Sequence, residues 1–252
     1  MTATRPQPVK TKQRSPRPRL PYFVAMWRSD IGKKWAMAVT GIIGLAYVVA
    51  HMIGNLHVYL GEAASPEYEY EIDHYGESLR DLLVPIFPRT YVLWGMRIVL
   101  IAAVVIHVWA AVGLALRNRR ARGGGYRSRR RYQAADYASR TMLWGGIIVL
   151  LFILFHLADL TWGPANPDFV RGAVYHNMVA SFERVPVAAL YVVANLALGL
   201  HIYHGAWSMF QSLGINNPRF NPWRRYFAVL VAGAVTAGNV SFPLMVQFGV
   251  VS

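Results

Sequence analysis

The chain has 252 residues, of which 55% are hydrophobic and only 15% are charged, and its formal net charge is +14. A soluble domain usually carries about 25% charged residues, so this composition is typical of a membrane protein. The absence of cysteine excludes disulfides, thiolate metal ligands, cysteine-held iron–sulfur clusters and cysteine nucleophiles within this chain.

The first 34 residues hold nine Lys or Arg and one acid, with prolines between them. A signal peptide would have an apolar region and a cleavage site soon after its charged start, and this stretch has neither. We therefore predict that residues 1–34 form a basic cytoplasmic arm that ends in an interfacial segment over residues 22–34.

Five apolar segments follow, each near the ~20 residues that a helix needs to cross a bilayer. They are residues 35–60, 91–116, 141–162, 185–213 and 226–249. The sequence therefore predicts an all-α membrane protein with one domain, residues 35–250, built as a bundle of five transmembrane helices.

The connecting loops differ sharply in charge, which predicts the orientation of the chain. Residues 61–90 hold seven acids and two bases, residues 117–140 hold nine bases and one acid, and residues 214–225 hold three bases and no acid. By the positive-inside rule, the arm and the two basic loops face the cytoplasm. The loops 61–90 and 163–184 and the C-terminus are expected outside the cytoplasmic membrane.

The basic loop 117–140 has two interpretations. A run of arginines could bind nucleic acid, but this run lies between two spans. Contact with anionic lipid headgroups or with a docked protein is the better interpretation, and we expect no nucleic-acid partner.

Histidines inside membrane spans are rare and mark functional sites. The candidates are His51, His107, His156, His201 and His204. His51 and His156 each lie roughly 16 residues from the inner ends of their spans, whereas the other three lie roughly 10 to 13 residues from theirs. The histidines therefore form two layers, and each layer draws on two helices.

Two facing imidazoles on separate helices are the pattern of bis-histidine haem ligation, because haem iron takes one axial ligand on each face. Small residues surround His201 at helical spacing, while His204 has bulkier neighbours and is the alternative ligand. A hydrogen-bonded core histidine and ordinary helix packing are the competing interpretations. A metal transporter or a proton pump would add carboxylates at similar depth, where only Asp159 qualifies.

Four stretches of the sequence together resemble the dihaem cytochrome b anchor of succinate dehydrogenase and fumarate reductase, the succinate:quinone oxidoreductases. The stretches are KKWAMAVTGIIGLAYVVAHMIGNL, IAAVVIHVWAAVGL, ILFHLADL and LHIYHGAWSMFQSLGINNPR. The most specific pieces are T-G-x-x-G followed by H-M-x-G-N in the first span, and H-x-x-x-G-x-W-S-x-F-x-S-L-G in the fourth. The resemblance covers roughly residues 30–250.

The resemblance implies two b haems, held by His51 and His156 on the outer side and by His107 and His201 on the inner side. It also implies docked flavoprotein and iron–sulfur subunits, a quinone substrate such as menaquinone, and a part in succinate oxidation in the tricarboxylic acid cycle. The chain itself would hold no residue that acts on succinate. Some members carry a glutamate two residues before the fourth-span ligand, where this chain has Gly199.

A quinone near the outer haem would need polar contacts, for which Asp159 and Trp162 are the candidates. Haem propionates need donors, and Arg97 inside the second span is the best of them. Weaker candidates for the propionates are Lys33, Lys34, Tyr47 and Arg140. The main alternative function is a cytochrome b anchor of another membrane dehydrogenase or of a hydrogenase, and a haem-free transporter is third.

Overall fold

The computed structural model describes residues 21–121 and 137–252, and within them the chain is helical with no strand. Five helices are long and apolar enough to cross a membrane, which confirms the expected number of spans. They are α2 (Asp30–Asn55), α4 (Tyr91–Ala121), α5 (Tyr137–Leu157), α7 (Val185–Ser212) and α8 (Asn221–Gln247).

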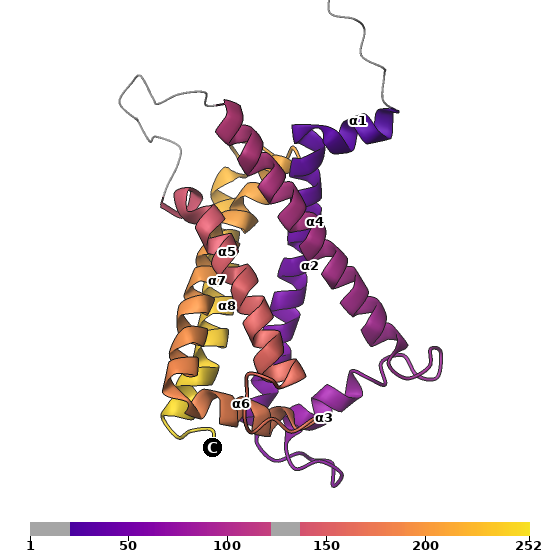
Figure 1. The fold of residues 1–252 in the computed structure, drawn as a ribbon, viewed down its shortest axis with the longest axis vertical. Coiled ribbons are helices and arrows are strands. Elements are labelled where there is room, and N and C mark those ends of the chain that lie inside the picture. The colour runs from indigo at the N-terminus through magenta and orange to yellow at the C-terminus, as the bar shows by residue number, and fades with distance from the viewer. Residues whose placement is uncertain (1–20, 122–136) are drawn as a thin grey trace, which may run out of the picture.

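The first span begins earlier than expected because a capping residue precedes it. The Ser29 side chain accepts a hydrogen bond from the backbone N–H of Gly32 at 2.9 Å, and Asp30 occupies the first turn. A short helix, α1 (Tyr22–Arg28), lies crosswise at this end of α2 (Figure 1). The expected interfacial segment is thus divided between α1 and the start of α2. Most of the arm lies outside the described residues.

Four short elements, which the sequence analysis treats as loops or span ends, gather at one end of the bundle (Figure 1). They are η1 (Leu56–Leu60), α3 (Glu71–Ser78), η2 (Ala158–Trp162) and α6 (Val174–Glu183). Tyr175, Met178 and Phe182 of α6 are buried in an apolar cluster with Ile72 of α3. The spacing of these three residues is the helical signal that the mixed loop composition concealed.

The helix ends alternate as the loop charges predict. The end of α4, the start of α5 and the connection between α7 and α8 lie near α1, whereas α3, α6 and the C-terminus lie at the opposite end (Figure 1). We call the second end the outer end, following the positive-inside rule. Large apolar side chains are exposed along all five long helices, as expected of surfaces that face lipid.

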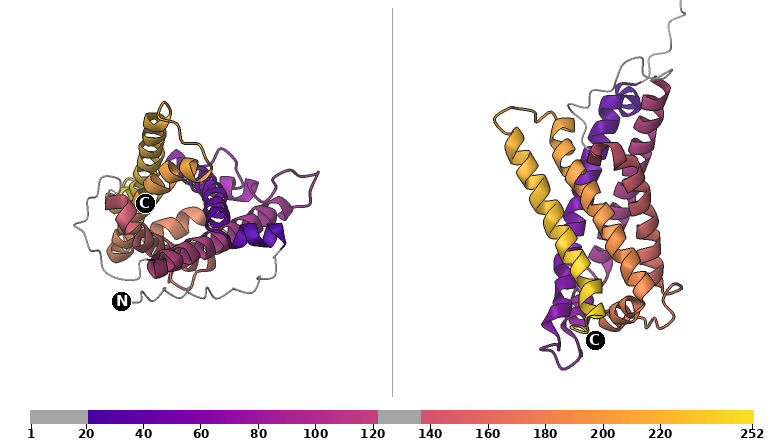
Figure 2. Two further views of the ribbon diagram at one scale, coloured as in Figure 1. Left: turned by 90° about the horizontal axis from the view of Figure 1, so that it is seen from above. Right: turned by 90° about the vertical axis from the view of Figure 1, so that its left-hand side faces the viewer.

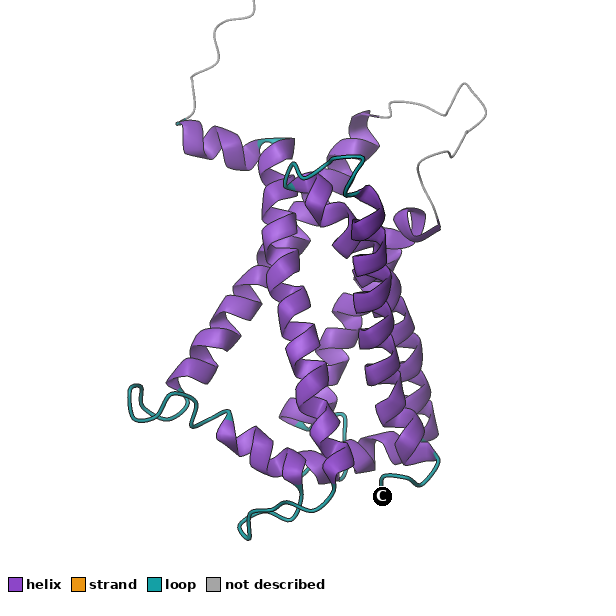
Figure 3. Cartoon of the chain, turned by 180° about the vertical axis from the view of Figure 1, so that it is seen from behind, coloured by secondary structure: helices purple, strands orange, loops and turns teal. Residues whose placement is uncertain are grey.

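Four of the long helices surround a common centre. Helix α2 packs against α4 and α7, and α5 packs against α7. Around the bundle the order is therefore α4, α2, α7 and α5, and α8 packs outside against α7 (Figure 2). This order puts α2 diagonally opposite α5, and α4 diagonally opposite α7. Seen from behind, α4 leans away from the bundle toward the outer end (Figure 3).

The contact between α7 and α8 is close and partly polar. The side-chain N–H of Asn239 donates to the side-chain oxygen of Asn195 at 3.0 Å, and Asn195 donates to the carbonyl of Tyr191 at 2.9 Å. Gly199 lies against Thr236, where an added Cβ would meet the hydroxyl oxygen at 2.1 Å. Hydrogen bonds between side-chain amides and close contacts at glycine hold membrane helices together, because lipid removes the hydrophobic driving force between helices.

Candidate functional site

Two pairs of imidazoles bridge the two diagonals of the bundle. His51 on α2 faces His156 on α5, with ring centroids 5.9 Å apart and planes at 80°. His107 on α4 faces His201 on α7, with centroids 6.3 Å apart and planes at 60°. The structure therefore brings together the same pairs that depth and resemblance predict. In each pair the rings approach each other from diagonally opposite helices.

His204, the alternative to His201, takes a different direction. Its ring contacts that of Trp207 on its own helix, with centroids 6.3 Å apart. The imidazole that faces His107 is that of His201. The geometry therefore favours His201 for the inner pair.

In the inner pair, Thr40 determines which nitrogen of His107 carries hydrogen. The Thr40 hydroxyl donates to the carbonyl of Ala36 at 2.7 Å, so its single hydrogen is already used. Its oxygen lies 3.2 Å from Nδ1 of His107 and therefore accepts from that nitrogen. The other nitrogen, Nε2, keeps its lone pair for a metal.

The outer pair repeats this arrangement with a different residue. The Tyr191 hydroxyl donates to Asp159 at 2.9 Å, and its oxygen lies 3.3 Å from Nδ1 of His156. A carboxylate only accepts, so His156 must be the donor in the second bond, and its Nε2 keeps the lone pair. The partner ring, His51, stacks on Tyr47 at 5.4 Å and has Asn55 at 3.4 Å from Nε2.

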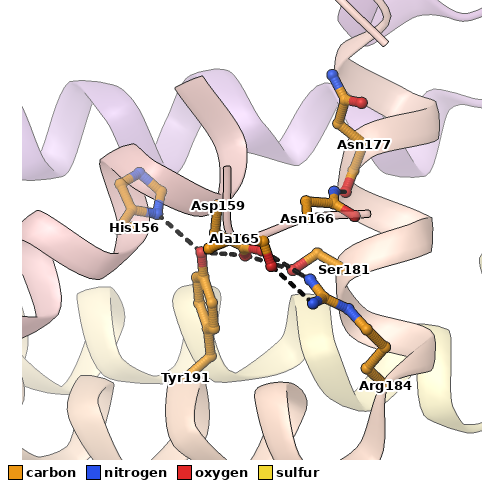
Figure 4. A network of polar contacts seen from close by, with 8 residues as sticks. All are labelled: His156, Asp159, Ala165, Asn166, Asn177, Ser181, Arg184 and Tyr191. Atoms are coloured by element: carbon orange, nitrogen blue, oxygen red, sulfur yellow. Dashed lines mark hydrogen bonds and ion pairs between the residues drawn. The ribbon is translucent and has the colours of Figure 1, made fainter. Parts of the chain in front are cut away.

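Asp159 is fully enclosed and holds several donors (Figure 4). Besides Tyr191, its carboxylate accepts from the Ser181 hydroxyl and forms a 2.7 Å ion pair with Arg184. Arg184 in turn donates to the carbonyl of Ala165 at 2.8 Å. Of the two quinone candidates, Asp159 thus has no exposed surface, whereas Trp162 at the end of η2 is 59% exposed.

The basic candidates occupy different places. Arg97, near the outer end of α4, is exposed and lies 5.0 Å over the ring of Trp94. Lys33, at the inner end of α2, is buried and lies 5.1 Å over the ring of Trp109. Lys33 and Arg97 thus provide a cation near each end of the bundle. The side chain of Arg140 lies outside the described residues.

The residues fit a haem in two respects. Two metal–imidazole bonds of about 2 Å and half a ring on each side would separate ring centroids by about 6 Å, which is the spacing of both pairs. At the inner level, the helices that carry no ligand present Gly41 and Gly146, whose Cβ positions would lie 3.6 and 3.5 Å from the imidazoles.

The ligand number also suits a porphyrin. Within residues 21–121 and 137–252, no group of three or more His, Asp or Glu is placed to hold a metal ion. A haem iron needs only two protein ligands, because the macrocycle supplies the other four nitrogens. Each histidine pair thus offers the two protein ligands that a haem iron would need.

The residues that orient the histidines are not evident from the sequence alone. Thr40 lies in the T-G-x-x-G motif, which indicates the family resemblance but not a hydrogen bond to His107. Tyr191 and Arg184 lie 35 and 28 positions after His156, and the packing of α7 against α5 and of α6 against η2 brings them near it. A polar residue within an apolar span was the available signal for Tyr191.

Comparisons with protein-family models, with curated proteins and with solved structures find no match to this chain.

Proposed function

We propose that this chain is the membrane-anchor cytochrome b subunit of a succinate:quinone oxidoreductase. The observation that carries the proposal is the pair of imidazole contacts, one across each diagonal of the bundle. His51 and His156 would hold the outer b haem, and His107 and His201 the inner one. When bound, the two haems supply one-electron carriers at two depths in the membrane.

The remaining residues prepare the site for these groups. Thr40 and Tyr191 fix the tautomers of His107 and His156 by accepting a hydrogen bond from Nδ1. In both imidazoles the lone pair is then on Nε2, the nitrogen away from the hydroxyl. Arg97 and Lys33 are the basic side chains proposed for the propionates. The exposed Trp162 is the candidate for contact with a quinone such as menaquinone near the outer haem.

The proposed partners are a flavoprotein and an iron–sulfur subunit that dock on the cytoplasmic side. The resemblance to the anchor family supports this, as does the charge of the inner loops, since residues 214–225 hold three bases and no acid. The same bases would also contact anionic lipid headgroups. A cytochrome b anchor of another dehydrogenase or of a hydrogenase would use the same histidine pairs with different soluble partners.

One purification tests both parts of the proposal. A tagged chain is isolated in mild detergent from its own membranes, and its haem is quantified by a reduced-minus-oxidised spectrum. Two b haems per chain are expected, and a haem-free chain would overturn the proposal. Co-purification of a flavoprotein and an iron–sulfur protein, with reduction of the haems by succinate, would separate this function from other cytochrome b anchors.

A further inference from the structure

The two haem-facing histidines that have a hydroxyl at Nδ1 differ in what lies behind that hydroxyl. Behind His107, the Thr40 hydroxyl ends on the neutral backbone carbonyl of Ala36. Behind His156, the Tyr191 hydroxyl ends on the Asp159 carboxylate, which is paired with Arg184. Of these two histidines, His156 is thus the one that hydrogen bonds connect to an ionic group (Figure 4).

We infer that Tyr191 and Asp159 are positioning residues that make His156 a more electron-donating ligand and so lower the reduction potential of the outer haem. The inference rests on the proposed function, since it requires a metal at Nε2 of His156. A carboxylate draws the Tyr191 hydrogen toward itself, and the phenol oxygen then accepts more strongly from Nδ1 of the imidazole. A more basic axial imidazole favours ferric over ferrous iron.

The surroundings keep this connection in place. Tyr191 is buried, and its ring contacts those of Phe152, Phe155 and Phe182 at centroid distances of 5.0, 6.0 and 4.8 Å. Asp159 is held independently by Ser181 and Arg184. Removal of the phenol hydroxyl would therefore cut the connection at its middle and leave both the aromatic packing and the ion pair intact.

Tyr191→Phe is accordingly the test variant, and Thr40→Val is the matched control at the inner pair. Both replacements keep the shape of the side chain and remove one hydroxyl. Each purified protein is titrated potentiometrically, and its ferric low-spin signals are recorded by electron paramagnetic resonance. His156→Ala, which should lack the outer haem, identifies the signal that belongs to that haem.

Tyr191→Phe should keep two haems, raise the midpoint potential of the outer haem and change its ferric signal, with the inner haem unaltered. Thr40→Val should leave the outer haem unaltered. If Tyr191→Phe binds both haems with both potentials unchanged, the inference is wrong while the haem assignment stands. If the unmodified chain binds no haem, it is the proposed function that fails.

Asp159→Asn, which retains the geometry but removes the charge, should shift the potential of the outer haem in the same direction. An unchanged potential in this variant would exclude the role of the carboxylate.

Discussion

His107 and His156 are each fixed on one side by a hydroxyl oxygen and open on the other. In both residues the hydrogen is on Nδ1, because the neighbouring hydroxyl has already donated its own hydrogen elsewhere. The orientation of a metal-binding imidazole normally depends on such a second partner. In each pair, one imidazole is therefore oriented with the lone pair on Nε2, which is the nitrogen that the proposed haem ligation would use.

If the proposed function holds, replacement of single histidines should remove one haem at a time. His156→Ala is expected to lose the outer haem and keep the inner one, and His107→Ala should do the reverse, because each haem loses one of its two axial ligands. The haem-to-protein ratio of the purified variants should fall from two to one.

His204→Ala is the matched control, since this ring contacts Trp207. It should retain both haems. Loss of a haem in this variant, or two haems in His156→Ala, would contradict the ligand assignment.

The pairing of the histidines was predictable from sequence, whereas the residues behind them were not. The depth of a residue along a span follows from counting residues, and His51 and His156 have the same predicted depth. The contact of Tyr191 with His156 depends on how α5 and α7 rotate and pack, which no local pattern records. Asp159 is a quinone candidate from its place after His156, and the sequence does not reveal that its carboxylate is buried against Tyr191, Ser181 and Arg184.

At the scale of the helices, two glycines border the inner pair. Gly41 of α2 and Gly146 of α5 lie beside His107 and His201, and a methyl group at either position would make an ordinary contact. Gly146→Ala should therefore bind two haems. Gly146→Leu should lose the inner haem, because its side chain would press on His201. Haem content by absorbance measures both, and full retention in the leucine variant would show that α5 does not border this haem.

The contact between α7 and α8 gives a second prediction. A Cβ at position 199 would meet the Thr236 hydroxyl oxygen at 2.1 Å, so Gly199→Ala forces either a turn of Thr236, which would lose its hydrogen bond to Ala232, or a shift of the two helices. The free energy of unfolding of this variant in detergent should fall by about 1 to 3 kcal/mol, the range typical of overpacking, and the variant should therefore unfold at a lower temperature. Adding Thr236→Ala should restore most of the loss. A double variant as unstable as the single one would place the cause elsewhere.

Element boundaries show where sequence reasoning reaches its limit. The five spans follow from long apolar runs, and their number agrees with the structure. Their ends were displaced where a local cap or a polar helical turn extends a span, as at Ser29 and Ala121. The short helix α6 was missed because its stabilisation comes from burial against α7 and α8, not from its own sequence.

For the whole molecule, the absence of cysteine makes the orientation measurable. Ala64 lies in an exposed part of the outer loop, and Ile215 lies in the exposed connection between α7 and α8. The variants Ala64→Cys and Ile215→Cys would each carry a single cysteine. A maleimide that cannot cross membranes should label position 64 in intact cells. It should label position 215 only after the membrane is opened. The reverse pattern would invert the orientation predicted from the loop charges.

The amide pair between α7 and α8 has a consequence for distant parts of the molecule. Asn195 and His201 lie on the same rigid helix, six positions apart, and Asn239 anchors the first of them from α8. A slide of α7 along α8 by one turn, about 5.4 Å, would break this anchor and carry His201 out of level with His107. Helix α8, which contributes no ligand, therefore helps to fix the depth in the membrane at which His201 would bind the inner iron.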